Sequence, residues 1–290
     1  MKFDKNTKIL IVGLGLIGGS YAKALSDEGY FVGAIDKKKS SVEYALKNGL
    51  IQVGETSVKK DFVKDFDLII FALYPHDFIN WIKEYQSSIK SGALITDVTG
   101  VKSFVVENVQ KILRGDLEFV GAHPMAGKEV SGVENADSKI FVGANYIVTP
   151  TKKNTDENVQ AVKDLGRALG FERISSLSPE EHDETVGFLS HLTHCIAVSL
   201  MVSKKSHHLA EYTGDSFRDL TRIAKINDEM WSELFLANKD ELLKQMDLFE
   251  EKFNQLKEDI KNDNREKIRE TLRESTARRK VFDKDAKETK

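Results

Sequence analysis

The sequence predicts an α/β protein with an N-terminal Rossmann-type doubly wound parallel sheet and an all-helical C-terminal domain. A strand, a glycine-rich turn and a helix follow one another near the start of the chain, strands and helices then alternate, and only helical patterns follow Ser178. With 290 residues, the chain is long enough for two domains that each bury a core. We expect these domains at residues 1–175 and 176–290.

The composition is that of a soluble globular protein, with 40% hydrophobic and 31% charged residues. A net charge of −3 gives no electrostatic reason to bind nucleic acid or anionic membranes nonspecifically. Residues 1–8 are polar and unlike a secretory signal, and no apolar run approaches membrane-spanning length. The single cysteine, Cys195, excludes an intramolecular disulfide. We therefore expect a cytoplasmic protein.

The first strand, residues 9–12, leads directly into the motif GLGLIGGS. Its GxGxxG spacing is typical of dinucleotide binding: the first glycine permits the tight turn, the second lets a pyrophosphate approach, and the third lets helix and strand pack closely. The N–H groups at the start of the following helix can bind the phosphates. The residues expected to bind the cofactor here are Gly13, Gly15, Leu16, Ile17 and Gly18. A glycine turn without a ligand is the alternative.

A second strand, residues 30–35, ends at Asp36, which lies 23 positions after Gly13. A carboxylate at this place can accept hydrogen bonds from both ribose hydroxyls of NAD, and its charge disfavours the 2′-phosphate of NADP. Lysines at 37–39 follow immediately and weaken that preference, so NADP stays possible.

Further strands and helices alternate in the manner of a parallel sheet. The strands are expected at residues 67–73, 93–96, 145–149 and 171–174, and the helices at 77–88, 103–113 and 155–169. In such sheets ligands bind beyond the carboxyl ends of the strands. Residues 74–76, 97–100 and the segment around His123 occupy those ends, so we expect them to face one crevice.

The segment 121–129, GAHPMAGKE, is a candidate active-site loop. It follows an apolar run and contains an imidazole, His123, and a carboxylate, Glu129, between a proline and glycines that shape the backbone. The alternative is a tight connection with one surface histidine.

From Ser178 onwards the chain is expected to be helical. Ser178 is a good N-cap, Pro179 suits the first helical position, and Glu181 completes a capping box. Helices are predicted up to residue 203 and at 217–225, 228–237, 240–261 and 265–281, before a frayed tail at 283–290. An apolar stripe recurs at three- and four-residue steps and indicates core or dimer packing: Leu243, Met246, Phe249, Phe253, Leu256 and Ile260.

Two residue pairs on these helices are candidates for chemistry. His191 and His194 share one helical face and could line a substrate pocket, pack internally, or bind a metal with neighbours drawn from His182, Cys195, His207 and His208. No second ligand pair completes a recognisable metal site, so no metal is expected. Arg218 and Arg222, with Asp219 between them, could clamp a carboxylate or form a solvated ion-pair face.

Several motifs in order resemble the prephenate and arogenate dehydrogenases of tyrosine biosynthesis. Besides the glycine loop and GAHPMAGKE, they are DVTGVKS (97–103), SHLTH (190–194) and FRDLTRIAKINDEMW (217–231). The resemblance implies a prephenate dehydrogenase that converts prephenate with NAD to 4-hydroxyphenylpyruvate. Hydride leaves the ring carbon that bears the hydroxyl, and the ring carboxylate leaves as carbon dioxide. Arogenate, which would yield tyrosine directly, is the alternative substrate.

The resemblance also implies roles for individual residues. His123 matches the histidine that accepts the proton of the substrate hydroxyl, and its ordinary pKa suits this work at neutral pH. Arg222 matches the arginine that holds the side-chain carboxylate, and Glu129 a glutamate that pairs with it at the pocket mouth. The other matches are His194, which contacts substrate, Trp231, which forms a pocket wall, and Asp219, which supports the site. His191 is counted with the substrate pocket.

The sequence departs from the family pattern at two positions. Gly100 stands where many relatives have a serine that steadies the catalytic histidine, so Thr99 or a water molecule is expected to take that role beside the cofactor. Thr193 replaces a frequent proline between the two histidines.

The resemblance implies a single-activity enzyme and a homodimer joined through the helical domains. The rival hypotheses are a β-hydroxyacid dehydrogenase, which would use a catalytic lysine on a helix, and an NAD-binding sensor without turnover.

Overall fold

A computed structural model describes residues 1–205 and 208–282. His207 and the tail 283–290, both of which entered the sequence analysis, lie outside the described residues. The chain divides into two compact units, Met1–Lys239 and Asp240–Lys290, which are described separately below. The domain boundary expected at residues 175 and 176 stays a prediction.

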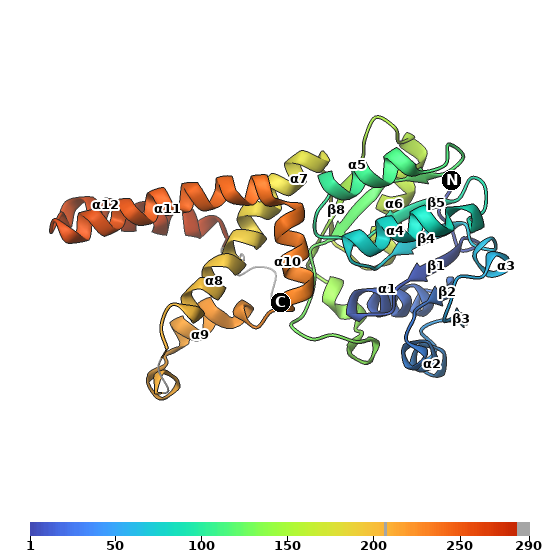
Figure 1. Cartoon of the computed structure of the whole chain (residues 1–290), viewed down its shortest axis with the longest axis horizontal. Coiled ribbons are helices and arrows are strands. Elements are labelled where there is room, and N and C mark those ends of the chain that lie inside the picture. Colours follow the sequence, from blue (N-terminus) through green and yellow to red (C-terminus); the bar gives the residue numbers. More distant parts are fainter. Residues whose placement is uncertain (206–207, 283–290) are drawn as a thin grey trace. The chain divides into compact units, whose positions relative to one another are not determined.

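The first unit is built on a six-stranded parallel sheet (Figure 1), which confirms the predicted fold class. Its strands are β1 (Lys8–Val12), β2 (Phe31–Ile35), β3 (Val53–Glu55), β4 (Leu68–Phe71), β5 (Leu94–Asp97) and β6 (Glu118–Phe119). They lie in the order β3-β2-β1-β4-β5-β6. The order reverses between β1 and β4, and ligands of doubly wound sheets bind beyond the carboxyl ends at such a point.

Helices cover both faces of this sheet. The helices α1 (Leu16–Asp27), α2 (Lys39–Lys47) and α6 (Asp156–Ala168) pack on one face, and α3 (Lys60–Val63), α4 (Pro75–Tyr85) and α5 (Ser103–Ile112) on the other. Because successive side chains of a strand point to opposite faces, Ile9 and Ile11 join the first core while Leu10 and Val12 join the second. This two-sided burial explains why strand β1 is apolar nearly throughout.

A second, three-stranded sheet positions His123. It consists of β7 (Gly121–Pro124), β8 (Asn145–Thr149) and β9 (Arg173–Ser176), in which β7 runs antiparallel to β8. His123 therefore lies on a strand, opposite Ile147, and the expectation that it lies in a loop is wrong. The loop begins only after Pro124 and contains Glu129. A strand holds the histidine more firmly than a loop, because ladder hydrogen bonds fix its backbone.

The next helical segment has nearly the predicted extent but is more apolar than expected. The helix α7 (Pro179–Val186) begins with the predicted capping box at Ser178, continues through a π-helical turn (Gly187–Leu192) and joins α8 (Thr193–Val202). Residues Pro179–Val202 meet the length and composition of a membrane-spanning helix, which corrects the expectation that no apolar run approaches that length. His182, Asp183 and His191 of this segment are buried in the first unit, so one face of the segment packs against the protein.

Two short helices and one turn complete the first unit. They are α9 (Asp215–Thr221), a 3₁₀ turn (Arg222–Ala224) and α10 (Asp228–Ala237). Leu234 of α10 belongs to the core that also contains α4 and α5, and Trp231 packs against the same core. The helix α10 therefore rests on the core that α4 and α5 form with the sheet.

The second unit contains most of α11 (Lys239–Lys261) and all of α12 (Arg265–Arg279). The predicted apolar stripe lies along α11, where Phe253 and Ile260 are each 59% exposed. Core packing within the described residues therefore does not account for the stripe.

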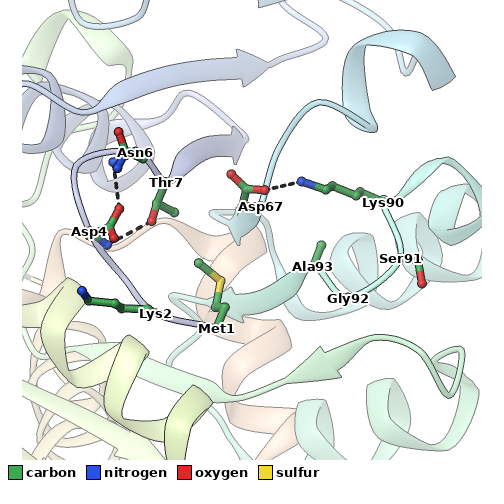
Figure 2. Close-up of a pocket in the computed structure, with 10 residues that line it drawn as sticks. All are labelled: Met1, Lys2, Asp4, Asn6, Thr7, Asp67, Lys90, Ser91, Gly92 and Ala93. Carbon is green, nitrogen blue, oxygen red and sulfur yellow. Dashed lines mark hydrogen bonds and ion pairs between the residues drawn. The ribbon is translucent and has the colours of Figure 1, made fainter.

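A cavity of about 270 Å³ lies beside the amino ends of β1 and β4. Figure 2 shows the Asp67–Lys90 ion pair in its wall, together with Asp4, Asn6 and Thr7 from the segment before β1. Ligands of parallel sheets bind at the opposite, carboxyl edge. The functional site is therefore expected at that edge.

The glycine turn after β1 is tightly packed. Gly13 has a positive φ of +100°, and a Cβ on it would lie 2.4 Å from the carbonyl oxygen of Ala72. A Cβ on Gly18 would lie 1.9 Å from the carbonyl oxygen of Gly13, whereas one on Gly15 would meet nothing within 4 Å. The first and third glycines are thus required by the fold itself, and the second is free to face a ligand.

Gly18→Ala should therefore lower the free energy of unfolding by ~3 kcal/mol or more, because two backbone segments must separate. Gly15→Ala is the matched control and should leave stability within about 1 kcal/mol, while weakening NAD binding. Urea unfolding of the apoprotein measures the first effect and fluorescence titration with NAD the second. Equal stability losses in both variants would contradict this packing argument.

Candidate active site

The start of α1 is open to an anionic ligand. The helix begins at Leu16, its N-cap Gly15 offers no side-chain hydrogen bond, and the first turn contains no acidic residue. The first N–H groups of a helix have no partner within the helix, and its dipole favours negative charge there. This end of α1, reached past the open Cα of Gly15, fits the pyrophosphate of a dinucleotide.

Asp36 follows β2 at the same edge of the sheet. Its Oδ2 accepts the N–H of Leu14 at 2.6 Å, and its Oδ1 accepts the N–H of Lys38 at 2.7 Å. A carboxylate has about four lone-pair sites, so two remain for the ribose hydroxyls. The predicted position of Asp36 beside the glycine turn thus fits NAD, and the two backbone bonds hold the carboxylate in place.

A buried ion pair lies beneath the end of β5. Lys102 Nζ is 2.6 Å from Asp97 Oδ2, and neither side chain is exposed. The Nζ also donates to Thr99 Oγ1 at 3.0 Å, while the other oxygen of Asp97 accepts the N–H of Ala122 at 3.0 Å. The ion pair therefore ties β5 to β7 one residue before His123.

His123 has a partner that sequence reasoning did not assign to it. Its Nδ1 lies 2.8 Å from Nε2 of His182 on α7, and Nδ1 of His182 lies 2.7 Å from Oδ1 of Asp183. Desolvation lowers the pKa of His123 well below its usual value, and the charge of Lys102, together with that of His182 whenever this ring is protonated, lowers it further. The ring is therefore neutral at physiological pH and able to accept a proton.

His191 and His194 both contact Trp231, as expected for residues on one helical face. The ring of His194 stacks on Trp231 with centroids 3.7 Å apart, and its Nδ1 is 2.8 Å from the carbonyl oxygen of Ser190. Because a carbonyl accepts, Nδ1 of His194 carries the proton and Nε2 is free for a ligand. His191 is 1% exposed, and its Nδ1 accepts from Asn238 at 3.2 Å. We therefore place His191 behind Trp231, as a support.

The predicted partners Arg222 and Glu129 form an ion pair across 93 residues of sequence. Both charges act on the pKa of His194, so this pair lies near the His194–Trp231 stack. Arg218 instead pairs with Asp215 at 3.1 Å on the same helix. Asp219 is exposed on α9, and no hydrogen bond joins it to the arginines in the described part of the chain. Its supporting role stays a prediction.

Comparison with known proteins decides the family. The description "Prephenate dehydrogenase, nucleotide-binding domain" matches residues 21–173, and "Prephenate dehydrogenase, dimerization domain" matches residues 178–274. The chain belongs to the prephenate dehydrogenase family. Members of this family are NAD-dependent oxidoreductases, and the two matches agree with the predicted order of the domains.

Relatives of the chain include prephenate and arogenate dehydrogenases. The prephenate dehydrogenase of Bacillus subtilis is 35% identical over 82% of this chain, which spans 66% of the length of that relative. The crystal structure of prephenate dehydrogenase from A. aeolicus with hydroxyphenyl propionate and NAD+ is 34% identical, with a TM-score of 0.87 over 96% of this chain and 98% of that one. The crystal structure of arogenate dehydrogenase from Synechocystis is 25% identical, with a TM-score of 0.82 over 96% of this chain and 100% of that one.

The resemblance implies that many relatives steady the histidine with a serine at the place of Gly100, which has no side chain for that role. Another group would have to take the role in this chain. Thr99 is not that group: its hydroxyl donates to Asp97 and lies 3.0 Å from both the carbonyl oxygen of Val101 and Lys102 Nζ. The expectation that Thr99 steadies His123 is therefore corrected in favour of His182. The signal available in the sequence is the adjacent pair His182–Asp183, of which only His182 is named in the sequence analysis, as a possible metal ligand.

The described residues contain no cluster of three or more histidine, cysteine or acidic side chains placed to bind a metal ion. His182, His191 and His194 each have protein partners, as given above. The arrangement offers proton transfer and carboxylate binding beside a dinucleotide site.

Lys102→Met should lower the free energy of unfolding by about 3–5 kcal/mol, because it leaves the buried carboxylate of Asp97 without its partner. The matched control is Lys90→Met, which removes a half-exposed ion pair with Asp67 and should cost about 1 kcal/mol or less. Urea unfolding at neutral pH compares the two. Similar losses would show that the Asp97–Lys102 pair does not hold β5 and β7 together.

Proposed function

We propose that this chain is a prephenate dehydrogenase that performs the NAD-dependent oxidative decarboxylation of prephenate to 4-hydroxyphenylpyruvate in tyrosine biosynthesis. The observation that supports this most directly is His123: a neutral imidazole on β7, held at Nδ1 by His182 and next to the ion pair at the end of β5. Such a group can accept a hydroxyl proton at neutral pH. Membership of the family supports the same reaction.

His123 would act twice in one turnover. Bound NAD supplies the hydride acceptor, held by the glycine turn, the start of α1 and Asp36. As the ring carbon that bears the hydroxyl is oxidised, His123 takes the hydroxyl proton. When the ring carboxylate leaves as carbon dioxide, the electrons of the broken C–C bond make the ring aromatic and the ring oxygen regains that proton. No net proton is consumed or released, so one histidine suffices.

The substrate would lie between His123 and the Arg222–Glu129 pair. The side chain of Arg222 is 65% exposed, and its guanidinium has five N–H donors in a planar fork. Glu129 uses only some of these donors. A substrate carboxylate can therefore bind Arg222 beside Glu129 or in its place. The free Nε2 of His194 and the ring of Trp231 would contact the substrate between these two ends.

We further propose that two copies associate through the helical region and that the enzyme works in the cytoplasm. The match to the dimerization domain covers residues 178–274, where apolar side chains are exposed in the single chain. They include Phe188, Leu189, Met201, Val202 and Phe253. Exposed apolar surface of this extent is typical of an interface.

The proposal is tested by offering prephenate and arogenate, each with NAD and with NADP, and recording the absorbance of the reduced cofactor. We expect prephenate with NAD to give the highest kcat/KM. Preference for arogenate would reassign the substrate to the amino form within the same family. If neither compound gave turnover, the chain would be a dinucleotide-binding protein without this activity.

His123→Asn should lower kcat by about 10²- to 10⁴-fold, because it removes the proton acceptor. The affinity for NAD, measured by fluorescence titration, should stay within about twofold. In the wild type, kcat should be constant from pH 8 down to about 6.5 and fall only at lower pH, since the pKa of His123 lies below its usual value and protonation abolishes the base. An unchanged kcat would remove His123 from the chemistry.

Arg222→Gln should raise the KM for prephenate about 10- to 100-fold, because a charge-assisted contact with the substrate carboxylate is lost. Arg218→Gln is the matched control: Arg218 pairs with Asp215 on the same short helix, and its loss should change KM less than about twofold. Steady-state kinetics at saturating NAD compares the two. The opposite order would make Arg218 the carboxylate ligand.

A further inference from the structure

Three side chains lie in line behind the site. His123 Nδ1 is 2.8 Å from His182 Nε2, and His182 Nδ1 is 2.7 Å from Asp183 Oδ1. His182 is completely buried and Asp183 is 2% exposed. Water therefore has little access to the inner end of this chain, and each group must find its hydrogen-bond partner within it.

Asp183 at the inner end is a carboxylate. Its Oδ1 accepts the N–H of Lys102 at 2.7 Å and its Oδ2 the N–H of Ser103 at 2.8 Å, at the start of α5. Burial alone would raise the pKa of Asp183, but its hydrogen bonds to His182 and to these backbone groups lower it below the usual value. The start of a ten-residue helix adds a favourable dipole. Asp183 can therefore only accept hydrogen bonds.

The protonation of both rings follows from this carboxylate. Because Asp183 only accepts, His182 Nδ1 must carry a proton. Burial keeps the pKa of His182 below its usual value in spite of Asp183, so the ring is neutral and its Nε2 is a bare acceptor. His123 Nδ1 must then donate to it. The second nitrogen of His123, Nε2, is left without a proton, and it is the nitrogen that can receive one from a substrate.

We propose that His182 and Asp183 are positioning residues that fix His123 in its Nδ1–H tautomer and share the positive charge that His123 gains when it accepts the substrate proton. The proposal rests on the proposed function for the origin of that proton, but the tautomer itself does not depend on substrate. When Nε2 of His123 is protonated, the Nδ1–H bond points at the lone pair of His182, whose own N–H points at the carboxylate. The charge is thus stabilised along two hydrogen bonds.

Within the described structure, no other side chain forms a hydrogen bond with Nδ1 of His123. The hydroxyl of Thr99 is used by Asp97, Val101 and Lys102. Gly100 lies next to the ring, with an added Cβ 3.8 Å from Cε1 of His123, but it offers no side-chain polar atom. The orientation of the His123 ring therefore depends on α7 in this chain.

The first test is independent of substrate. Imidazole nitrogens of ¹⁵N-histidine-labelled protein are recorded by long-range ¹H–¹⁵N correlation NMR at neutral pH, and His123 and His182 are assigned from the spectra of His123→Asn and His182→Gln. We expect both rings to be neutral Nδ1–H tautomers in the wild type. A neutral Nε2–H tautomer of His123, or a doubly protonated His182, would overturn the proposal whether or not the enzyme uses prephenate.

The second test separates positioning from stability. In His182→Gln the side-chain oxygen can still accept a hydrogen bond from His123, and we expect kcat to fall about 10-fold. In His182→Leu no acceptor remains, and we expect kcat to fall 100-fold or more. The Nε2–H tautomer of His123 should then appear in the NMR spectrum. KM should change less than about twofold in both. The matched control is Glu184→Gln, the exposed neighbour of Asp183, which should behave as wild type.

If His182 had only a structural role, the variants would give different results. Both His182 variants would then lose thermal stability, while the fraction that stays folded would keep the wild-type kcat and the wild-type His123 tautomer. Thermal unfolding is therefore recorded on the same samples, and kcat is expressed per folded molecule. If kcat were unchanged in His182→Leu on that basis, the proposal would be wrong.

Discussion

The contact of Asp183 with the start of α5 is the constraint on which the site depends. Its carboxylate accepts two backbone N–H groups of α5 and the proton of His182, so one side chain joins helix α7 to the nucleotide-binding part and sets the state of the histidines. Asn238 adds a second connection, since its amide donates to the carbonyl oxygen of Asp183 and to His191. The parts of the site that lie far apart in sequence are therefore held by a few buried polar contacts.

These contacts also explain how charged and polar side chains can be buried next to His123. Buried polar groups are costly unless they are bonded, and the interior near His123 contains a lysine, two aspartates and two further histidines. Opposite charges are paired, as in Lys102 and Asp97, and the histidines stay neutral. His123 is therefore surrounded by buried polar groups that are hydrogen-bonded to one another. Such a fixed polar environment favours proton transfer.

The sequence predicted the features that depend on local pattern. The glycine turn, Asp36, the capping box at Ser178 and most helices are visible in the sequence because spacing and propensity within a few residues determine them. The strand at His123 is not recognisable in the sequence, because it is only four residues long and contains a proline and a glycine, which usually mark turns. The partner of His123 is not visible in the sequence, because 59 residues separate it from His182 and the packing of α7 on α5 and β8 brings them together.

The π-helical turn at Gly187–Leu192 has a consequence for how this helix tolerates changes in length. Such a turn contains one residue more than the α-helix needs. Deleting one residue from it, such as the exposed Phe188, would restore an ordinary helix and leave the residues on either side nearly in phase, because the wider turn covers about the same rotation with one residue more. If all six residues instead tightened into an ordinary α-helix, everything beyond would rotate by about 100° relative to α7. His182 would keep its place behind His123, but His194 would leave the face of Trp231. The π-helical turn thus keeps the proton-transfer half of the segment in phase with its substrate-facing half.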